Sequence, residues 1–319
     1  MQKTQLRTSP LGATGLEITC VGFGAWAIGG GGWEFGWGPQ QDDESIAAIH
    51  RALDLGVNWI DTAAAYGFGR SEQIVGRALQ GLAERPYVLT KNSLLDDGTR
   101  HVRHVLKRDS ILREAEASLR RLGVDAIDLY QIHWPIPEQD IEEGWAAMAE
   151  LKERGLVRHI GVSNFSASQL RRIASIAPVE TIQPPYSLID RGAEAEILPL
   201  AQRDGIGVIV YSPMGSGLLT GGITRERIAA MPGDDWRKSD PRFTEPQLSR
   251  HLALAARLQT VAARHGTAPG AVAIAWTLRN PAVDGAIAGF RRPAQVDPIL
   301  AAAGLELTGQ DMTDIETAG

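Results

Sequence analysis

The stretch SLRRLGVDAIDLYQIHWP, residues 118–135, contains the end of one predicted helix and the whole of the predicted strand that follows it. Its first residues close an amphipathic run that predicts a helix over 111–122. Gly123 follows an arginine-rich last turn and is typical of a helix end. Residues 127–132 are apolar and rich in strand-forming side chains, so they predict a buried strand that ends at His133.

The same alternation of short apolar and longer amphipathic runs extends from residue 20 to the end of the chain. The expected strands lie at residues 21–23, 57–60, 87–89, 127–132, 159–162, 181–183, 207–210 and 285–288. The expected helices lie at residues 44–55, 72–79, 111–122, 141–154, 167–176, 193–203 and 268–278. Strands that lead into helices predict a parallel sheet with crossover helices. A chain of 319 residues fits a closed (β/α)8 TIM barrel, which takes about 250 residues plus extra segments, better than an open sheet.

Three segments lie outside this alternation. Residues 16–18 can pair with residues 5–8 as an N-terminal β-hairpin that plugs one end of the barrel. A long irregular loop is expected over 215–245, after the seventh strand, and an extra helix over 248–265. Because no linker, low-complexity segment or repeat interrupts the chain, residues 1–319 are predicted to form a single domain.

The composition excludes several classes of protein. The net charge of −6 offers no electrostatic footprint for nucleic acid. The single cysteine, Cys20, excludes an internal disulfide framework, a thiolate zinc cluster and an iron–sulfur centre, and is expected to pack beside the first strand. The sequence contains neither a signal-peptide segment nor a run of about 18 apolar residues, so we expect a cytoplasmic protein without a membrane partner. Nothing in the sequence indicates an oligomeric state.

One basic segment has a spacing that could bind a metal ion. Residues 100–108 contain His101 and His104, but no third ligand is indicated beyond Asp96 and Asp97. We therefore predict no metal site and interpret the segment as a solvated loop.

Thirteen of the 35 glycines lie in two segments that follow the first and the seventh expected strand, at residues 22–38 and 215–233. Active sites of barrels form at the ends of strands, where both segments lie. A Rossmann dinucleotide motif is excluded, because GFG at 22–24 leads into AWA at 25–27 and not into a third glycine and a helix. We interpret the two segments as mobile rims of one barrel mouth. The expected walls of the substrate site are Trp26, Trp33 and Trp134.

Four ionisable side chains lie at or just after the ends of three consecutive expected strands: Asp61, Tyr66, Lys91 and His133. Strand ends converge on one face of a parallel barrel, so these side chains are expected to meet. A phenol has a pKa near 10, and a neighbouring lysine held by an aspartate is expected to lower it. A neutral histidine can position a substrate carbonyl by hydrogen bonding. The set suits protonation of an alkoxide as a hydride arrives, and the hydride must come from a cofactor.

The chain resembles the aldo-keto reductase superfamily over essentially its whole length. Its motifs are closer to bacterial members near the channel-β-subunit-like branch than to aldose reductase. The resemblance identifies Asp61, Tyr66, Lys91 and His133 with the catalytic tetrad of that family. The matching stretches are LGAT (11–14), VGFGAW (21–26), NWIDTAAAYGFGRSE (58–72), VLTK (88–91), SLRRLGVDAIDLYQIHWP (118–135), GLVRHIGVSNFS (155–166), IQPPYSLI (182–189), VYSPMGSGLLTG (210–221) and AGFRRPAQV (288–296).

The resemblance also implies a nicotinamide dinucleotide bound by the barrel itself. In the family pattern Ser163, Asn164 and Gln183 would hold the carboxamide. Tyr211 would stack on the nicotinamide ring. The other expected cofactor contacts are Gly24, Ala25, Trp26, Ser212, Pro213, Met214, Gly215, Ser216, Leu218, Gly289, Arg291 and Gln295.

The adenosine end departs from the family pattern at Phe290, Pro298 and Ile299. Arg291 or Arg292 still offers a guanidinium for a 2′-phosphate. The sequence therefore favours NADP, with NAD or dual use as the alternative.

These features predict hydride transfer from NADPH to a small-molecule aldehyde or ketone, with Tyr66 as the general acid. The main alternative is a sugar or alcohol dehydrogenase in which the same residues work in the oxidative direction. A cofactor-sensing regulatory subunit with little turnover is an alternative from a different class. A barrel lyase or isomerase without a nicotinamide cofactor is the remaining one.

Overall fold

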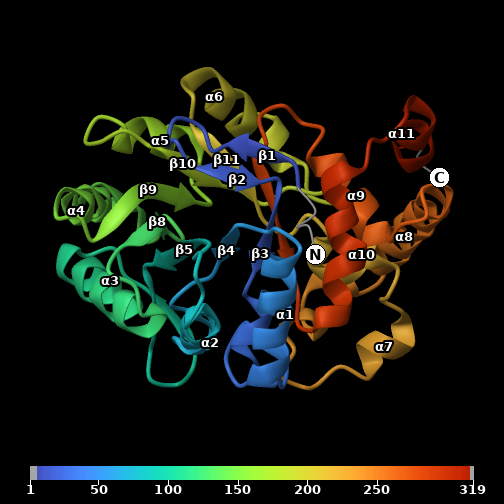
Figure 1. The fold of residues 1–319 in the computed structure, drawn as a ribbon, viewed down its shortest axis with the longest axis horizontal. Coiled ribbons are helices and arrows are strands. Elements are labelled where there is room, and N and C mark those ends of the chain that lie inside the picture. Colours follow the sequence, from blue (N-terminus) through green and yellow to red (C-terminus); the bar gives the residue numbers. More distant parts are fainter. Residues whose placement is uncertain (1–5, 317–319) are drawn as a thin grey trace.

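The computed structural model describes residues 6–316, and eight parallel strands in it close into a barrel (Figure 1). The barrel confirms the predicted (β/α)8 architecture, and every expected strand is present within a few residues of its predicted bounds. In barrel order the strands are β3 (Val21–Gly24), β4 (Trp59–Asp61), β5 (Tyr87–Asn92), β8 (Ile127–Ile132), β9 (Val157–Ser163), β10 (Thr181–Gln183), β11 (Gly207–Val210) and β12 (Gly285–Gly289).

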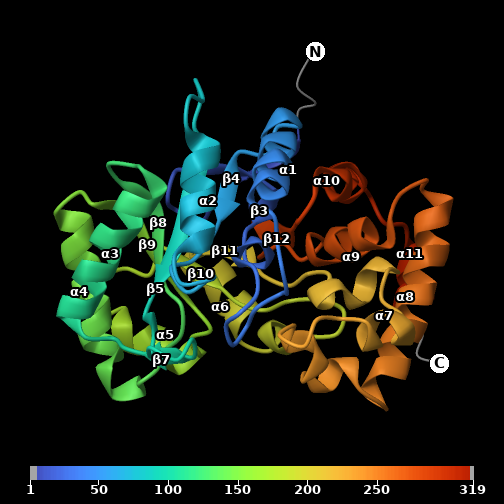
Figure 2. The same cartoon turned by 90° about the horizontal axis from the view of Figure 1, so that it is seen from below.

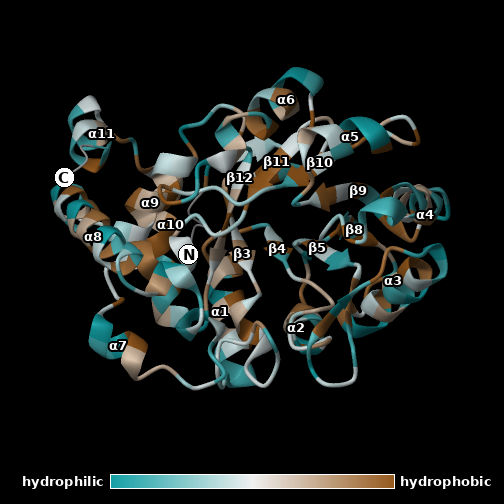
Figure 3. Ribbon diagram, turned by 180° about the vertical axis from the view of Figure 1, so that it is seen from behind, coloured by the Kyte–Doolittle hydropathy of each residue, from teal (hydrophilic) through white to brown (hydrophobic). Residues whose placement is uncertain are grey.

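Amphipathic helices surround the barrel, and Figure 3 shows them with apolar and polar faces around largely apolar strands. The expected helix over 193–203 begins later, at Ile197, because Pro199 is tolerated only in a first turn. The helices that follow the strands include α1 (Asp42–Asp54), α2 (Arg70–Leu79), α3 (Arg108–Leu122), α4 (Ile141–Glu153), α5 (Ala167–Ile173), α6 (Ile197–Asp204), α9 (Pro269–Thr277) and α10 (Val296–Leu300).

An N-terminal hairpin lies across one end of the barrel, as predicted, but with a different first strand. β1 (Thr8–Pro10) pairs with β2 (Glu17–Thr19), so the pairing starts where the expected segment 5–8 ends. Residue 5 lies outside the described part of the chain. The hairpin contributes apolar side chains to a plug that fills the barrel interior: Leu11, Leu16 and Ile18 with Trp59, Leu89, Leu129, Ile209 and Ile287.

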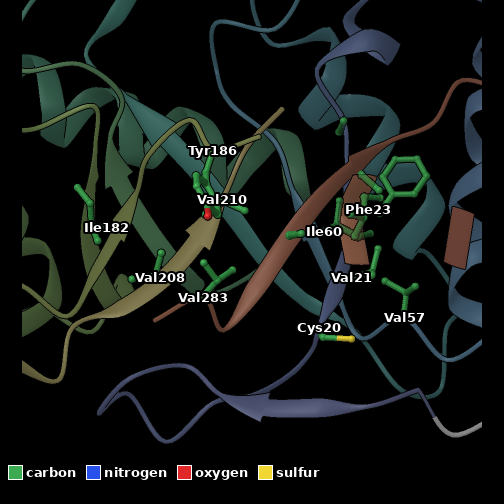
Figure 4. Close-up of a cluster of buried hydrophobic side chains, with 14 of the residues drawn as sticks. Cys20, Val21, Phe23, Val57, Ile60, Ile182, Tyr186, Val208, Val210 and Val283 are labelled. Atoms are coloured by element: carbon green, nitrogen blue, oxygen red, sulfur yellow. The ribbon is translucent and has the colours of Figure 1, made fainter. Parts of the chain in front are cut away.

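The remaining core lies between the strands and the helices, and Figure 4 shows part of it around β3. Cys20 is 1 % exposed there, beside Val21 and Val57. Burial raises the pKa of the Cys20 thiol, as expected for a packed cysteine and not for a reactive one.

The expected long loop over 215–245 is present, and it contains short helical turns, among them α7 (Arg225–Ala229). It packs against α8 (Gln247–Arg264) through a small apolar cluster of its own, to one side of the barrel (Figure 2). The expected basic loop over 100–108 instead contains β7 (Val102–His104), which pairs with β6 (Leu94–Asp96), because alternating ladder bonds satisfy its backbone.

No group of three or more metal-type ligands is found among residues 6–316. Within the same range, no helix has the length and apolar character needed to cross a membrane.

Glu114 is a buried carboxyl on the inner face of α3. Its two oxygens accept hydrogen bonds from Ser93 N at 2.9 Å and from Ser110 Oγ at 3.0 Å. Burial raises the pKa of Glu114 to about 7. Because the folded-state pKa lies above the unfolded value, stability linked to this group is present below about pH 4.5 and is lost as the pH rises through 7.

Glu114→Gln keeps an acceptor oxygen and removes the buried charge. We expect it to raise the free energy of unfolding at pH 8 by up to about 3 kcal/mol and to have little effect near pH 4.5. Urea unfolding at both pH values measures the difference. An equal effect at pH 8 and pH 4.5 would contradict the assignment.

Candidate active site

A buried ion pair lies where the strands β4 and β5 end inside the barrel. Lys91 Nζ donates to Asp61 Oδ1 at 2.6 Å and to the carbonyl oxygen of Thr62 at 2.9 Å. The side chains of Lys91 and Asp61 are 0 % and 4 % exposed. Lys91 Nζ also lies 3.5 Å from the hydroxyl of Tyr66. The structure therefore brings together three of the four ionisable residues that the sequence singled out.

Strand alternation explains why Lys91 points inward. Leu89 belongs to the interior plug, and residues two apart on a strand share a face, so Lys91 points into the barrel above it. The neighbouring strand repeats the pattern, because Lys91 pairs in register with Gln131 and the chain then leads to His133. The ring centroid of His133 lies 5.7 Å from that of Tyr66, edge to face. All four predicted residues thus meet at one end of the barrel.

A second polar network continues from the ion pair along β9, β10 and β11. Gln183 Nε2 donates to Asp61 Oδ2 at 2.9 Å, and Ser163 Oγ donates to the carbonyl oxygen of Gln183 at 2.7 Å. Asn164 Nδ2 donates to the carbonyl oxygen of His133, and Tyr211 OH donates to Asn164 Oδ1 at 2.8 Å.

Asn164 has a left-handed backbone, with φ of 64°. Such a conformation is uncommon outside glycine, asparagine and aspartate, and it is often found at functional sites. The polar network therefore holds Asn164 in a special conformation next to the residues of the ion pair.

A cavity of about 830 Å³ opens over these residues. Its volume lies in the range of ligand and cofactor pockets. Four of the predicted site residues do not line it, and all four are buried: Ala25, Lys91, Gly215 and Leu218. The predicted residues that do line it are Gly24, Trp26, Trp33, Asp61, Tyr66, His133, Trp134, Ser163, Asn164, Gln183, Tyr211, Ser212, Pro213, Met214, Ser216, Gly289, Arg291 and Gln295.

Aromatic rings form one wall of the cavity around Tyr66. The Trp26 ring is stacked against Tyr66 at 6.2 Å and against Trp236 at 5.1 Å. Trp33 lies 6.5 Å from Tyr66, and its Nε1 donates to the carbonyl oxygen of Gly30. Trp37 meets Trp26 edge to face at 5.3 Å. The hydroxyl of Tyr66 therefore lies in a site with apolar walls.

The glycine-rich segment 22–38 contacts the residues that directly follow the second glycine-rich segment, 215–233. Gly32 N donates to Asp234 Oδ2 at 2.8 Å, and Trp236 N donates to the carbonyl oxygen of Gly36 at 3.1 Å. The Arg237 guanidinium lies 4.3 Å from the centroid of the Trp37 ring and pairs with Asp235.

The sequence analysis missed three charged residues that line the cavity: Arg237, Asp240 and Arg242. The only signal for them is the mixture of charge and tryptophan in DDWRKSDPRF, residues 234–243, within a segment that was expected to be irregular.

Burial sets the protonation states of the site. It lowers the pKa of His133 well below its usual range, and the positive charge of Lys91 adds to this effect, so His133 is neutral at pH 7. Burial raises the pKa of the Tyr66 phenol well above its usual range, and the charge of Asp61 adds to that. The expected lowering of the Tyr66 pKa by Lys91 is not seen, because burial of the phenol is the largest effect and acts in the opposite direction.

The structure thus defines a closed (β/α)8 barrel with a cluster of polar and ionisable groups at one mouth, where barrels form their active sites. The chain belongs to the aldo/keto reductase family, whose model matches residues 21–319. It is therefore an NAD(P)H-dependent oxidoreductase that acts on carbonyl groups.

Several relatives match nearly the whole chain. Aldo-keto reductase YhdN of Bacillus subtilis (strain 168) is 41 % identical over 95 % of this chain and 91 % of its own length. The NADH-specific methylglyoxal reductase of Escherichia coli (strain K12) is 36 % identical over 97 % of both chains. Among solved structures, a glycerol dehydrogenase from Gluconobacter oxydans has a TM-score of 0.85 and 38 % identity, covering 99 % of this chain and 95 % of that one.

Removal of one partner from the buried Lys91–Asp61 pair should lower the free energy of unfolding. Lys91→Met leaves the Asp61 carboxylate unpaired inside the barrel, so we expect a loss of about 3–5 kcal/mol in the free energy of unfolding. The double variant Asp61→Asn, Lys91→Met should lose less than the sum of the two single variants, because no charge is then left unpaired. Urea unfolding measures all three variants.

Arg203→Ala serves as the control, because it removes an exposed pair with Asp204 and should leave stability nearly unchanged. Strictly additive losses in the double variant would show that Lys91 and Asp61 are not energetically coupled.

Proposed function

We propose that the protein reduces an aldehyde or ketone with a reduced nicotinamide dinucleotide and that Tyr66 is the general acid. The observation that carries this proposal is the contact of Tyr66 with the Lys91–Asp61 pair at the base of a cavity, opposite a neutral His133. At this place the hydroxyl of Tyr66 can give its proton to a bound substrate, and the apolar wall of the cavity excludes competing water.

Each residue has a distinct role in the proposed reaction. His133, being neutral, donates a hydrogen bond to the substrate carbonyl and orients it toward Tyr66. Tyr66 gives its proton to the oxygen as negative charge develops there. The resulting phenolate lies beside Lys91 Nζ, which stabilises it, while Asp61 holds Lys91 in place. Lys91 and Asp61 are thus positioning residues that act through Tyr66.

The cavity residues fit a nicotinamide dinucleotide. A bound reduced nicotinamide supplies the hydride that no side chain can provide. Ser163, Asn164 and Gln183 present amide and hydroxyl groups to the cavity next to Asp61, as a carboxamide requires. Tyr211 presents a ring at the same place.

The segment after β11 suits the phosphates of the cofactor. Ser212 and Ser216 both have left-handed backbones, with φ of 55°, and both line the cavity. Successive left-handed and turn residues form concave sites that bind anions through backbone N–H groups. Arg227, Arg237 and Arg242 also line the cavity, and Asp235 and Asp240 offset the charge of the last two.

The family resemblance favours NADPH as the hydride donor, while one relative is by name specific for NADH. Both cofactors share the nicotinamide half that the tetrad would contact. The choice between them is made at the adenosine end and does not alter the proposed chemistry.

Tyr66→Phe removes only the phenolic oxygen and keeps the ring contacts with Trp26 and Trp33. We expect the turnover number for an aldehyde such as 4-nitrobenzaldehyde to fall at least about 100-fold, because the proton donor is lost. The dissociation constants of NADPH and NADH, from quenching of tryptophan fluorescence, should stay within about threefold. Full activity in Tyr66→Phe would show that the proton comes from another group.

Oxidation of an alcohol is the second candidate, supported by the likeness to a glycerol dehydrogenase. The same residues serve both directions, since the acid of the reduction is the base of the oxidation. Oxidation releases a proton, so its rate should rise between pH 7 and pH 10 while reduction does not. Initial rates with glycerol and NAD or NADP, compared with those for aldehydes, decide which direction is preferred.

A further inference from the structure

Arg291 follows β12 and lines the cavity, yet its guanidinium is already bound to the segment that follows β3. Its Nε donates to Gln40 Oε1 at 2.7 Å, and its Nη1 donates to the carbonyl oxygen of Trp37 at 3.1 Å. Its Nη2 donates to the carbonyl oxygen of Pro39. Gln40 Nε2 returns a hydrogen bond to the carbonyl oxygen of Arg291 at 2.8 Å. Each nitrogen of the guanidinium therefore has a partner within the protein.

The backbone donors at this place are occupied as well. The N–H groups of Arg291 and Arg292 both donate to Gln295 Oε1, at 2.8 Å and 3.1 Å. Gln295 thus closes the turn that starts the short helical segment Pro293–Gln295. A phosphate at this turn would have to displace the Gln295 side chain.

Arg292 is the guanidinium that is more accessible to a ligand. Its side chain is 68 % exposed, and its Nε lies 3.7 Å from Glu44 Oε2. Glu44 lies in the first turn of α1 together with Asp42 and Asp43. Glu44 competes with a phosphate for Arg292 and repels its charge, and solvent weakens any pair that an exposed arginine forms.

We propose that this site binds NADH at least as tightly as NADPH, because Arg291 positions the segment over residues 37–40 and is not a clasp for the 2′-phosphate. The inference rests on the proposed function. It changes the assignment of Arg291 from a direct cofactor contact to a positioning residue. The position of residues 37–40 at the mouth of the cavity then depends on Arg291, whichever cofactor is bound.

Equilibrium binding tests the inference without activity. Quenching of tryptophan fluorescence gives dissociation constants for NADH, NADPH and the fragments 5′-AMP and 2′,5′-ADP. We expect the wild-type constant for NADPH to be no lower than that for NADH. Arg292→Ala should weaken NADPH by only about two- to fivefold, as for an exposed pair, and leave NADH unchanged.

Arg291→Ala should weaken both cofactors by a similar factor, because it releases the segment over residues 37–40. Gln40→Ala removes one acceptor of Arg291 and should also shift both constants together, which keeps the test usable if Arg291→Ala folds poorly. Arg203→Ala, a charge loss far from the site, should change neither constant.

The opposite result is equally clear. NADPH bound more than about tenfold tighter than NADH, with that advantage lost selectively in Arg291→Ala, would overturn the inference and leave the proposed function intact. Binding of neither cofactor to the wild-type protein would overturn the proposed function together with the inference.

Discussion

The buried pair of Lys91 and Asp61 is the interaction on which the site depends. Two charges in a dry interior are tolerated only when they pair and fill their remaining hydrogen-bonding capacity. Lys91 Nζ does so with the Thr62 carbonyl and Tyr66, and Asp61 does so with Gln183. The pair therefore fixes the phenol and, through Gln183, the start of the polar network on β9 and β10. A site built on strands in this way is held more firmly than one built on loops.

The loops around the mouth are held by one another. The segment after β3 receives contacts from the segment after β11 through Asp234 and Trp236, and from the turn after β12 through Arg291. Three strands that are far apart in the sequence are neighbours or next neighbours in the barrel, so their loops meet. Glycine is needed where two segments of backbone approach closely: a Cβ on Gly29 would lie 2.8 Å from the backbone carbonyl carbon of Tyr66.

Much of the fold could be predicted because the two periodicities of a barrel are visible in the sequence. The strand Ile127–Ile132 and the end of α3 before Gly123 agree with their predicted bounds. Sequence reasoning failed where an element depends on contacts more than on a pattern of its own: β7 forms because it pairs with β6, and the short turns after β11 form because their apolar side chains pack with α8. The protein partners of Arg291 could not be predicted either, since they lie some 250 residues away in the sequence.

The sequence by itself determined the barrel class, the strand ends at which Asp61, Lys91 and His133 lie, and the family. These features follow from local patterns and from residue types at fixed spacing. Both are visible in the sequence even when the tertiary contacts are not known. Only the tertiary structure decided the raised pKa of Tyr66, the neutral state of His133 and the partners of Arg291. Burial and charge at a point depend on every element packed around it, and those elements come together only in the folded protein.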